Sequence, residues 1–273
     1  MKRILITGEH GYIGTAIAAH LGQYPEQYAA ERISVRGFTP EAFDFRGVDA
    51  IIHTAAFVHQ KETAETQPLF DTVNRDLCEA LAKKAKHDGV KQFVFFSTMS
   101  VYGMDTGTIT RDSVPTPRTQ YGRSKLMAER RIAPLSDAGF AVTILRPPVV
   151  FGTGAKGNPA RIERLAKCLP FCPDFENRRS MVSIETLCST VKTLLDEPRS
   201  GIFFPQEPKP LSTCDLIERA MREQGKTPKR SKLLNPAIRL LRACTRVGKK
   251  AFGDLVYEDL TELSLPDGEE GSE

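Results

Sequence analysis

Tyr121 and Lys125 are the two side chains whose types and spacing most directly suggest chemistry. A helix is predicted from about Thr119 to Asp137, and residues four apart on a helix share a face. A phenol normally ionises near pH 10, and an ammonium beside it favours the phenolate and lowers that pKa. The pair is therefore expected to exchange a proton with a carbonyl or an alcohol. A solvated helix face that carries the pair by chance is the alternative.

A glycine-rich turn near the start of the chain predicts a dinucleotide site. Ile4-Leu5-Ile6 is typical of a buried strand, and Thr15 to Leu21 has helical periodicity. Between them, Gly8 permits a tight turn, Gly11 lets the backbone approach a pyrophosphate, and Gly14 allows close packing of helix on strand. Three further residues of the turn are expected at the cofactor: His10, Tyr12 and Ile13.

The second predicted strand, at about Arg32 to Val35, bears on the choice of cofactor. An acidic residue at its end would bind the ribose hydroxyls of NAD, but here Arg36 follows. An Arg can meet the 2′-phosphate of NADP, so NADP(H) is favoured and NAD(H) stays open. Residues 37–48 leave little room for another helix. This part of the sheet is expected to be trimmed, with Asp44 and Phe45 near the adenine.

Strands and helices alternate along the first part of the chain. Strands are predicted at 48–53, 90–96 and 140–145, and a helix is predicted from Leu69 to His87. This alternation predicts an α/β fold, a Rossmann-like doubly wound parallel sheet. Small residues at the end of the strand at 48–53 let a cofactor lie close across the sheet, and they are Thr54, Ala55 and Ala56.

Taken together, these segments resemble the extended short-chain dehydrogenases/reductases, the NAD-dependent epimerase/dehydratase family of nucleotide-sugar enzymes. The resemblance covers about residues 1–205, in the order and spacing of that family. The matching residues are Thr7-Gly8-x-x-Gly11-x-x-Gly14, His53-x-Ala55-Ala56, Asn74, Ser97-Thr98 with Val101-Tyr102-Gly103, Tyr121-x-x-x-Lys125 and Leu145-Arg146-Pro147-Pro148-Val149-Val150-Phe151-Gly152. Within the family, the sequence is most similar to capsule and O-antigen nucleotide-sugar 4-keto-reductases.

The resemblance implies roles for individual residues. Thr98 would hydrogen-bond the substrate oxygen, Tyr121 would pass the proton, and Lys125 would tune Tyr121 and bind the ribose. Ser97 is expected to be structural, and Tyr102 is not the catalytic Tyr. Two further residues are expected at the cofactor, Asn74 and Pro147. The substrate is expected to meet Val58, Met99, Ser100, Asn158, Arg178 and Arg179.

A smaller C-terminal lobe is expected to bind the substrate. Residues 1–152 would form the dinucleotide-binding domain, and 153–265 would form mainly the substrate lobe. A strand and helix at about 182–205 would return to the first domain, and 266–273 would be a disordered tail. Arg179 fits the register of the family's Arg that holds the sugar-nucleotide diphosphate, because a guanidinium fork suits phosphate oxygens. Two solvated Arg side chains are the alternative.

The reaction implied is reduction of a UDP-4-keto-6-deoxy-N-acetylhexosamine, with hydride passing from the nicotinamide C4 to the sugar C4. A dehydratase needs an acid/base pair after the catalytic Thr, and Met99-Ser100 in that place argues against dehydration. A UDP-hexose 4-epimerase that retains NAD is one alternative. A cofactor-binding regulator without catalysis is another.

Bulk properties narrow the remaining choices. The 273 residues carry a net charge of +4, which suits an anionic small molecule and is no footprint of nucleic acid. No signal peptide, membrane span or metal-ligand spacing is recognised, so a cytoplasmic enzyme without a metal is expected. The resemblance implies a homodimer through the helices bearing Asn74 and Tyr121. The basic amphipathic stretch Pro236–Phe252 is expected to pack its apolar face, with nucleotide cover or membrane-surface contact as alternatives.

Overall fold

The computed structural model describes residues 1–58, 60–155, 158–258, 260–263 and 265, and only the backbone of 158–160. A seven-stranded sheet in the order β13-β10-β6-β4-β3-β1-β2 forms its centre. All neighbours in it run parallel except β10 and β13, which are antiparallel. The strands are β1 (Lys2–Thr7), β2 (Tyr28–Ile33), β3 (Ala50–His53), β4 (Gln92–Phe96), β6 (Ala141–Leu145), β10 (Gly201–Phe203) and β13 (Glu262–Leu263). This arrangement confirms the predicted Rossmann-like α/β fold.

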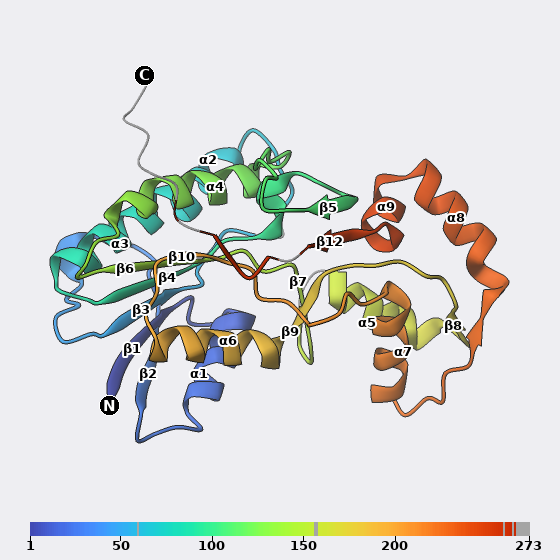
Figure 1. Ribbon diagram of the computed structural model, residues 1–273, viewed down its shortest axis with the longest axis horizontal. Helices are drawn as coiled ribbons and strands as arrows, with labels where there is room; N and C mark the ends of the chain where they lie inside the picture. Colours follow the sequence, from blue (N-terminus) through green and yellow to red (C-terminus); the bar gives the residue numbers. More distant parts are fainter. Residues whose placement is uncertain (59, 156–157, 259, 264, 266–273) are drawn as a thin grey trace.

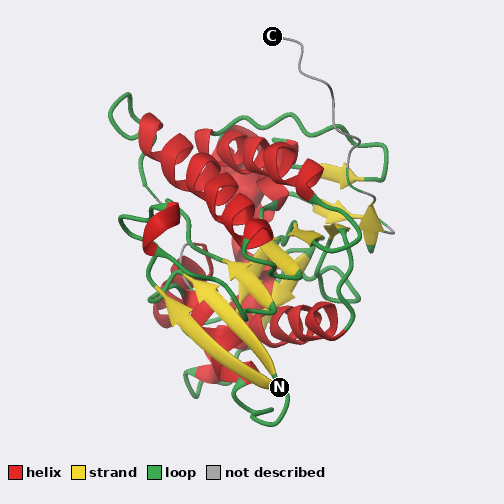
Figure 2. Ribbon diagram, turned by 90° about the vertical axis from the view of Figure 1, so that its left-hand side faces the viewer, coloured by secondary structure: helices red, strands yellow, loops and turns green. Residues whose placement is uncertain are grey.

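Helices cover both faces of the sheet (Figures 1 and 2). One face carries α1 (Tyr12–Leu21) and α6 (Ile184–Asp196), which pack against each other and against the sheet's isoleucines. The other face carries α3 (Leu77–His87) and α4 (Gln120–Ile132). Both layers are apolar where they meet the sheet, so the inner strands β3, β4 and β6 are almost fully buried and are rich in hydrophobic residues.

The strand order reverses direction at β1. From β1 the chain pairs β2 on one side and then returns to place β3 on the other. Ligands of open parallel sheets bind at such a reversal, beyond the carboxyl ends of the strands. Residues 37–48 contain a single 3-10 turn, Pro40–Ala42, so no further strand extends the sheet beyond β2.

Several predicted elements have different bounds in the structure, and the helix predicted from Thr119 to Asp137 ends at Ile132. The second strand spans Tyr28–Ile33 rather than 32–35, because all six residues of β1 pair with it in that register. The helix predicted from Leu69 to His87 is divided into α2 (Gln67–Phe70), a π-helical turn (Asp71–Asp76) and α3. A π turn rotates the residues that follow it, and such turns are frequent at functional sites.

The C-terminal part of the chain lies mostly to one side of the sheet (Figure 1). Its core joins Phe175, Cys214, Ile217, Met221 and Phe252. Residues 201–203 and 262–263 lie instead in the main sheet, as β10 and β13. The remaining elements are η3 (Met99–Tyr102), β5 (Gly107–Ile109), η4 (Ala133–Leu135), β7 (Val149–Phe151), α5 (Asn158–Cys168), β8 (Cys172–Pro173), β9 (Met181–Ser183), α7 (Thr213–Glu223), β11 (Arg230–Ser231), η5 (Lys232–Leu234), α8 (Asn235–Cys244), α9 (Arg246–Phe252) and β12 (Leu255–Tyr257).

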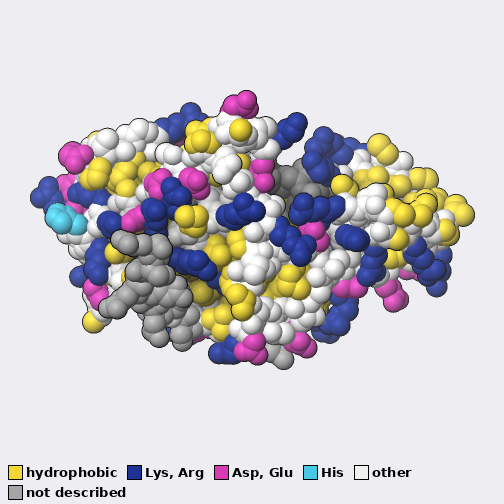
Figure 3. Space-filling model, turned by 90° about the horizontal axis from the view of Figure 1, so that it is seen from above, with side chains coloured by type: hydrophobic (Ala, Val, Ile, Leu, Met, Phe, Trp, Pro, Cys, Tyr) yellow, Lys and Arg dark blue, Asp and Glu magenta, His cyan; other side chains and the backbone are white. Residues whose placement is uncertain are grey.

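The stretch predicted as one basic helix is two helices, and its apolar face is only partly packed. The chain leaves the helical conformation at Thr245, whose hydroxyl accepts the Gly248 N–H and caps α9. Ile238 and Phe252 are buried, but Leu240, Leu241 and Val247 are exposed, so the expectation that the apolar face packs is wrong for these. Figure 3 shows hydrophobic side chains gathered at this end of the molecule beside Lys and Arg side chains. The predicted tail, 266–273, lies outside the described residues.

Candidate active site

The glycine turn between β1 and α1 forms one wall of a cleft of roughly 1910 Å³. Gly8 has φ +92°, a conformation that favours glycine, and the Gly11 N–H donates to its carbonyl at 2.8 Å. A Cβ on Gly14 would lie 2.9 Å from Thr54 Oγ1, so glycine is needed there for the helix to approach β3. No side chain caps α1, and its first turn has no acidic residue. Its N–H groups are thus available to a pyrophosphate.

Side chains beneath and beside the turn hold it in place. The Thr54 hydroxyl donates to the Thr7 carbonyl at 2.5 Å, which joins the ends of β1 and β3. The Arg32 guanidinium donates to the Glu9 carbonyl at 2.6 Å and to the Thr15 hydroxyl at 2.8 Å. Sequence reasoning gave Arg32 no role in the turn. The wall of the cleft is therefore preorganised by contacts that involve β1, β2, α1 and the end of β3.

Thr98 and Tyr121 meet across the same cleft. Thr98 follows β4 by two residues and caps η3, where its hydroxyl accepts the Ser100 N–H at 3.1 Å. Tyr121 lies in the first turn of α4, which Thr119 caps through the Gly122 N–H. Burial raises the pKa of Tyr121 to about 12, and a hydrogen bond with Thr98 acts in the opposite direction. A phenol with this pKa is fully protonated at neutral pH, as a proton donor must be.

Lys125 also lines the cleft, but it does not lower the pKa of Tyr121 as the spacing predicted. Its ammonium donates to the Phe96 carbonyl at 2.7 Å and lies 4.6 Å from the centroid of the Phe95 ring. Burial lowers the pKa of Lys125 to about 8, although the charges of Cys78 and Glu129 act against that shift. The predicted stabilisation of the phenolate is therefore wrong for this structure, because burial raises the pKa of Tyr121 and the Lys125 ammonium is bonded to the Phe96 carbonyl instead.

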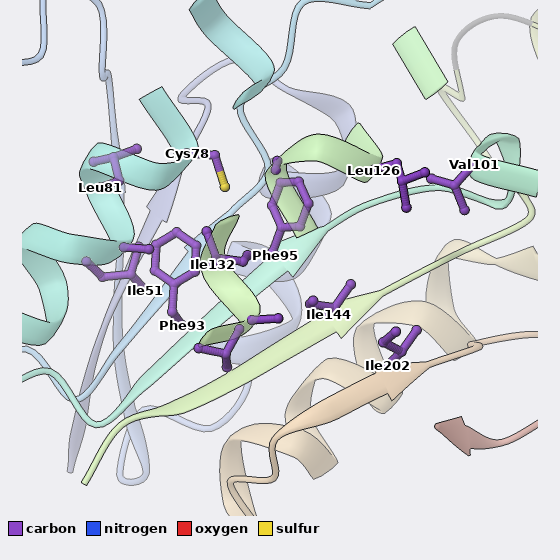
Figure 4. Packing of buried hydrophobic residues seen from close by; sticks show 14 of the residues in the cluster. Ile51, Cys78, Leu81, Phe93, Phe95, Val101, Leu126, Ile132, Ile144 and Ile202 are labelled. Atoms are coloured by element: carbon purple, nitrogen blue, oxygen red, sulfur yellow. The ribbon is translucent and has the colours of Figure 1, made fainter. Parts of the chain in front are cut away.

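A buried ion pair fixes α4, the helix that carries both of these side chains. Glu129 accepts from Arg146 at 3.1 Å and 2.5 Å, and the Ser97 hydroxyl donates to the same carboxylate. Arg146 also donates to the Tyr102 hydroxyl at 2.8 Å, which places Tyr102 in this network and away from the cleft. Figure 4 shows Ile132 of α4 beside Phe93 and Phe95 of the sheet, and Leu126 of the same helix beside Val101. Ser97 thus has a structural contact, in line with the sequence expectation.

The far end of the cleft is strongly cationic. Arg179 is buried, and its guanidinium donates to the Gly253 carbonyl at 2.9 Å. Asp105 pairs with Arg246 at 3.0 Å and with Lys250 at 3.7 Å, which fixes α9 on the cleft wall. The cations lining this end are Arg161, Arg164, Arg179, Arg246 and Lys250. Two phosphates of a substrate would be held well by such a cluster.

Comparisons with known proteins bear on the identity of this cleft. The model of the NAD dependent epimerase/dehydratase family matches residues 4–202. The chain belongs to this family. It is an extended short-chain dehydrogenase/reductase, a class of nucleotide-sugar epimerases and reductases that use NAD(P).

Individual relatives of this family member include epimerases and reductases. The UDP-glucose 4-epimerase of Vibrio cholerae is 29% identical over 244 residues, 79% of this chain and 74% of that protein. A solved dTDP-4-dehydrorhamnose reductase from Bacillus anthracis, in complex with NADP, has a TM-score of 0.69 at 19% identity and covers 84% and 83% of the chains. The UDP-glucuronic acid 4-epimerase from Bacillus cereus, in complex with NAD, has a TM-score of 0.69 at 18% identity and covers 94% and 88%. The two structures show the shared fold.

Most of the residues assigned from the family pattern lie in the cleft. Besides those already placed, its lining includes His10, Tyr12, Ile13, Arg36, Ala55, Ala56, Val58, Met99, Ser100 and Pro147. Asn158 belongs to the backbone-only segment, so its side chain lies outside the described residues. Among the described residues, no group of three His, Cys, Asp or Glu side chains could hold a metal ion. None of the described helices combines the length and apolar character needed to cross a membrane.

Asn74 is not in the cleft, contrary to the prediction. It is fully buried by the π turn, and its amide accepts the Phe57 N–H at 2.7 Å and donates to the Phe57 carbonyl at 3.1 Å. A third bond at 3.1 Å reaches the Ser124 hydroxyl on α4. Asn74 therefore positions the loop after β3, whose Ala55 and Ala56 line the cleft, and does not itself face the cofactor space.

Three other predicted placements are also corrected. Phe45 is buried in the sheet core rather than beside an adenine, because a loop this short turns its aromatic ring under β3. The Asp44 carboxylate is paired with Arg46 at 2.6 Å and faces solvent. Arg178 is exposed outside the cleft, with its backbone N–H bonded to Asp254, while its neighbour Arg179 faces inward.

Proposed function

We propose that the protein reduces a UDP-4-keto-6-deoxy-N-acetylhexosamine at C4 with NADPH. The observation that supports this most is the convergence of Thr98, Tyr121 and Lys125 on the cleft that the glycine turn lines. The bound cofactor would supply a hydride from its nicotinamide C4. The glycine turn, the free N-terminus of α1 and the small residues after β3 fit such a dinucleotide.

The side chains of the cleft would complete the reaction at the sugar's C4 oxygen. The Thr98 hydroxyl would hydrogen-bond that oxygen as negative charge develops on it. Tyr121, protonated at neutral pH, would donate the proton. Met99 is mostly buried and Ser100 is uncharged, so neither could act as the acid/base pair of a dehydratase. The reaction would thus end with reduction at C4.

Arg36 supports the choice of NADPH. It lines the cleft beyond the end of β2 and forms no ion pair with any described residue. Replacing it in Arg36→Ala is expected to raise the KM for NADPH about tenfold or more, because a charge-assisted bond to the 2′-phosphate is lost. The KM for NADH should stay within about twofold of the wild-type value. Steady-state kinetics with both cofactors, with Arg178→Ala as a control outside the cleft, would test this.

The cationic end of the cleft supports a nucleotide-sugar substrate. Arg179 and its cationic neighbours would hold the diphosphate, and the sugar would then extend toward Thr98 and Tyr121. The choice of UDP rests on the family resemblance and on the UDP-sugar enzymes among the relatives.

A UDP-hexose 4-epimerase is the second candidate, and a specific observation favours it. The Vibrio cholerae relative, which aligns over 79% of this chain, is named UDP-glucose 4-epimerase. An epimerase would keep NAD bound and return the hydride, so it would consume no reduced cofactor overall. The same three catalytic side chains would serve both reactions. Their presence also argues against a regulator that only binds the cofactor.

The test is to follow NADPH oxidation by absorbance at about 340 nm, with a panel of UDP-4-keto sugars and with UDP-glucose. Reductase activity predicts stoichiometric oxidation and a new C4 hydroxyl in the product by NMR. Interconversion of UDP-hexoses without net oxidation would establish the epimerase instead. Cofactor binding without turnover of any nucleotide-sugar would leave only the hypothesis of a regulator.

We also propose a homodimer through α3 and α4, and sedimentation would measure its mass.

A further inference from the structure

The outward face of α8 and α9 carries apolar side chains that the described residues leave exposed. Leu240 is 65% exposed, Val247 68% and Leu241 41%, and Leu233 just before α8 is 75% exposed. Ile238 is the buried apolar residue of α8. The helix thus turns most of its apolar side chains away from the protein core, the reverse of an ordinary surface helix.

Helical spacing places these side chains on one continuous strip. Positions three, four and seven apart share a face, and the exposed small or apolar residues of α8 follow that spacing. They are Pro236, Ala237, Leu240, Leu241 and Cys244. We call this strip, with Leu233 and Val247, the α8–α9 face. Contiguous exposed apolar surface of this kind marks an interaction site.

The charge around the α8–α9 face has a single sign. Between Gln224 and Gly253 the chain has nine basic residues and no Asp or Glu: Lys226, Lys229, Arg230, Lys232, Arg239, Arg242, Arg246, Lys249 and Lys250. Some are neutralised by acids from elsewhere, such as Arg242 by Asp254. Lys232, Arg239 and Lys249 form no ion pair with any described residue. These three are exposed beside the apolar strip.

We infer that the α8–α9 face docks on an anionic membrane surface. Apolar side chains on one side of a helix and basic side chains along its margins are what an interfacial helix needs, because the first enter the acyl boundary and the second meet lipid phosphates. The helices would lie on the bilayer, since no described helix is long and apolar enough to cross it.

A second copy of the chain fits this face less well. A two-fold symmetric contact would bring the same patch from both subunits together, and their uncompensated cations with it. Like charges facing each other across an interface oppose association. An anionic lipid surface instead matches the charge and covers the apolar strip at the same time.

The docked face would adjoin the substrate end of the cleft. Arg246 and Lys250 of α9 contribute to the cleft wall, where both pair with Asp105. One short helix thus borders both the substrate space and the proposed membrane contact. The docking itself needs no catalysis, so it can be tested whatever the reaction proves to be.

The test is flotation of the full chain with lipid vesicles. Vesicles of phosphatidylcholine containing about one third phosphatidylglycerol should carry the protein upward, and vesicles of phosphatidylcholine alone should not. Raising the salt from about 0.05 to 0.3 M should weaken binding, because the charges are exposed. No flotation with anionic vesicles at low salt would overturn the proposal.

Variants separate this face from general stickiness. Leu240→Ser with Val247→Ser should weaken binding to the vesicles about tenfold or more, and Arg239→Gln with Lys249→Gln should weaken it about 25-fold, at roughly fivefold per charge. Val114→Ser is the matched control. Val114 is 74% exposed, is distant from this face in the sequence and is not part of it. Unchanged thermal midpoints would show that the variants fold. The assignment would be contradicted if the Val114 variant lost as much vesicle binding as the double variants, or if both double variants bound fully. It would also be contradicted if the double variants changed the protein from dimer to monomer and no vesicle binding occurred.

Discussion

Tyr121 and Lys125 lie on one face of α4. Burial raises the pKa of the Tyr121 phenol and lowers the pKa of the Lys125 ammonium, so it favours the neutral form of each side chain. The Lys125 ammonium donates its hydrogen bond to the Phe96 carbonyl rather than to the Tyr121 phenol. Tyr121 is therefore suited to give a proton in the reductive direction, since it holds that proton throughout the neutral range. At the residue scale, the environment decides which half of the acid–base couple is populated.

Tyr121→Phe should lower kcat for reduction by at least about a hundredfold, because general acid catalysis contributes this much or more. The dissociation constant for NADPH should be nearly unchanged, since the ring that lines the cleft is kept. Stopped-flow or steady-state oxidation of NADPH and fluorescence titration of the cofactor would measure the two quantities. A variant with wild-type turnover would remove Tyr121 from the reaction.

His53 should make the protein sensitive to mild acid. It is fully buried at the end of β3, its Nδ1 is 2.8 Å from the Thr7 hydroxyl, and burial lowers its pKa to about 3. Unfolded His titrates near 6.5, so between these values the unfolded state binds more protons and stability falls as the pH falls. From about pH 7.5 to 5, His53 should account for roughly 2 kcal/mol of the lost unfolding free energy.

Urea unfolding of the wild type and of His53→Asn at both pH values would measure this contribution. The Asn variant loses some stability at every pH, but that cost cancels when each protein is compared with itself. The loss of unfolding free energy between the two pH values should be smaller in the Asn variant than in the wild type. Equal losses in the two proteins would show that His53 is not the titrating group.

At the scale of elements, α4 is held in register by contacts that sequence motifs do not reveal. Glu129 is about two turns beyond Tyr121 and about one turn beyond Lys125. It binds Arg146 at the exit of β6 and Ser97 at the exit of β4. The Tyr257 hydroxyl donates to the Arg146 carbonyl at 2.9 Å, which joins β12 to the same network. One buried carboxylate thus connects the helix of Tyr121 and Lys125 with the ends of two strands.

Glu129→Ala should cost about 3–5 kcal/mol of unfolding free energy, because it leaves the buried Arg146 without its counter-charge. Arg130→Ala, on the exposed side of the same helix, should change it by no more than about 0.5 kcal/mol. Urea denaturation at neutral pH would measure both. A Glu129 variant as stable as the Arg130 variant would show that the ion pair contributes little net stability.

At the scale of the whole molecule, the cleft is built from both the sheet and the C-terminal elements. Its nucleotide end depends on β1, α1 and β3, while its cationic end depends on α5, α9 and the segment of Arg179. β12 pairs with β5, so the two parts also share backbone hydrogen bonds. Ligands bound at either end should therefore stabilise the same folded unit.

NADPH at about a hundredfold excess over its Kd should add about 2.7 kcal/mol of stability and raise Tm by roughly 5 °C. UDP should raise it further. In Arg179→Ala the increment from UDP should be lost and the increment from NADPH kept, because Arg179 lies at the far end of the cleft. Differential scanning fluorimetry would measure these increments. Loss of the NADPH increment alone would reverse the assignment of the two ends.

Several features were predictable because they depend on neighbours in sequence. The glycine turn, the Tyr121–Lys125 spacing and the alternation of strands and helices are local patterns. A tight turn, a shared helix face and a buried strand each need only a few consecutive residues of the right type. The same patterns carried the family resemblance, and the family comparison agrees with it.

Tertiary structure decided what each pattern faces. Asn74 points inward because a π turn interrupts its helix, and Phe45 enters the core because the loop after β2 is short. The direction of the Tyr121 pKa shift follows from burial by distant segments. The basic stretch near the end breaks at Thr245, so that α9 reaches the cleft while Leu240 stays exposed. The sequence by itself determined the fold class and the chemical groups of the site. Which groups are desolvated, paired or exposed was decided by contacts between residues far apart in the chain, because burial is a property of the packed molecule.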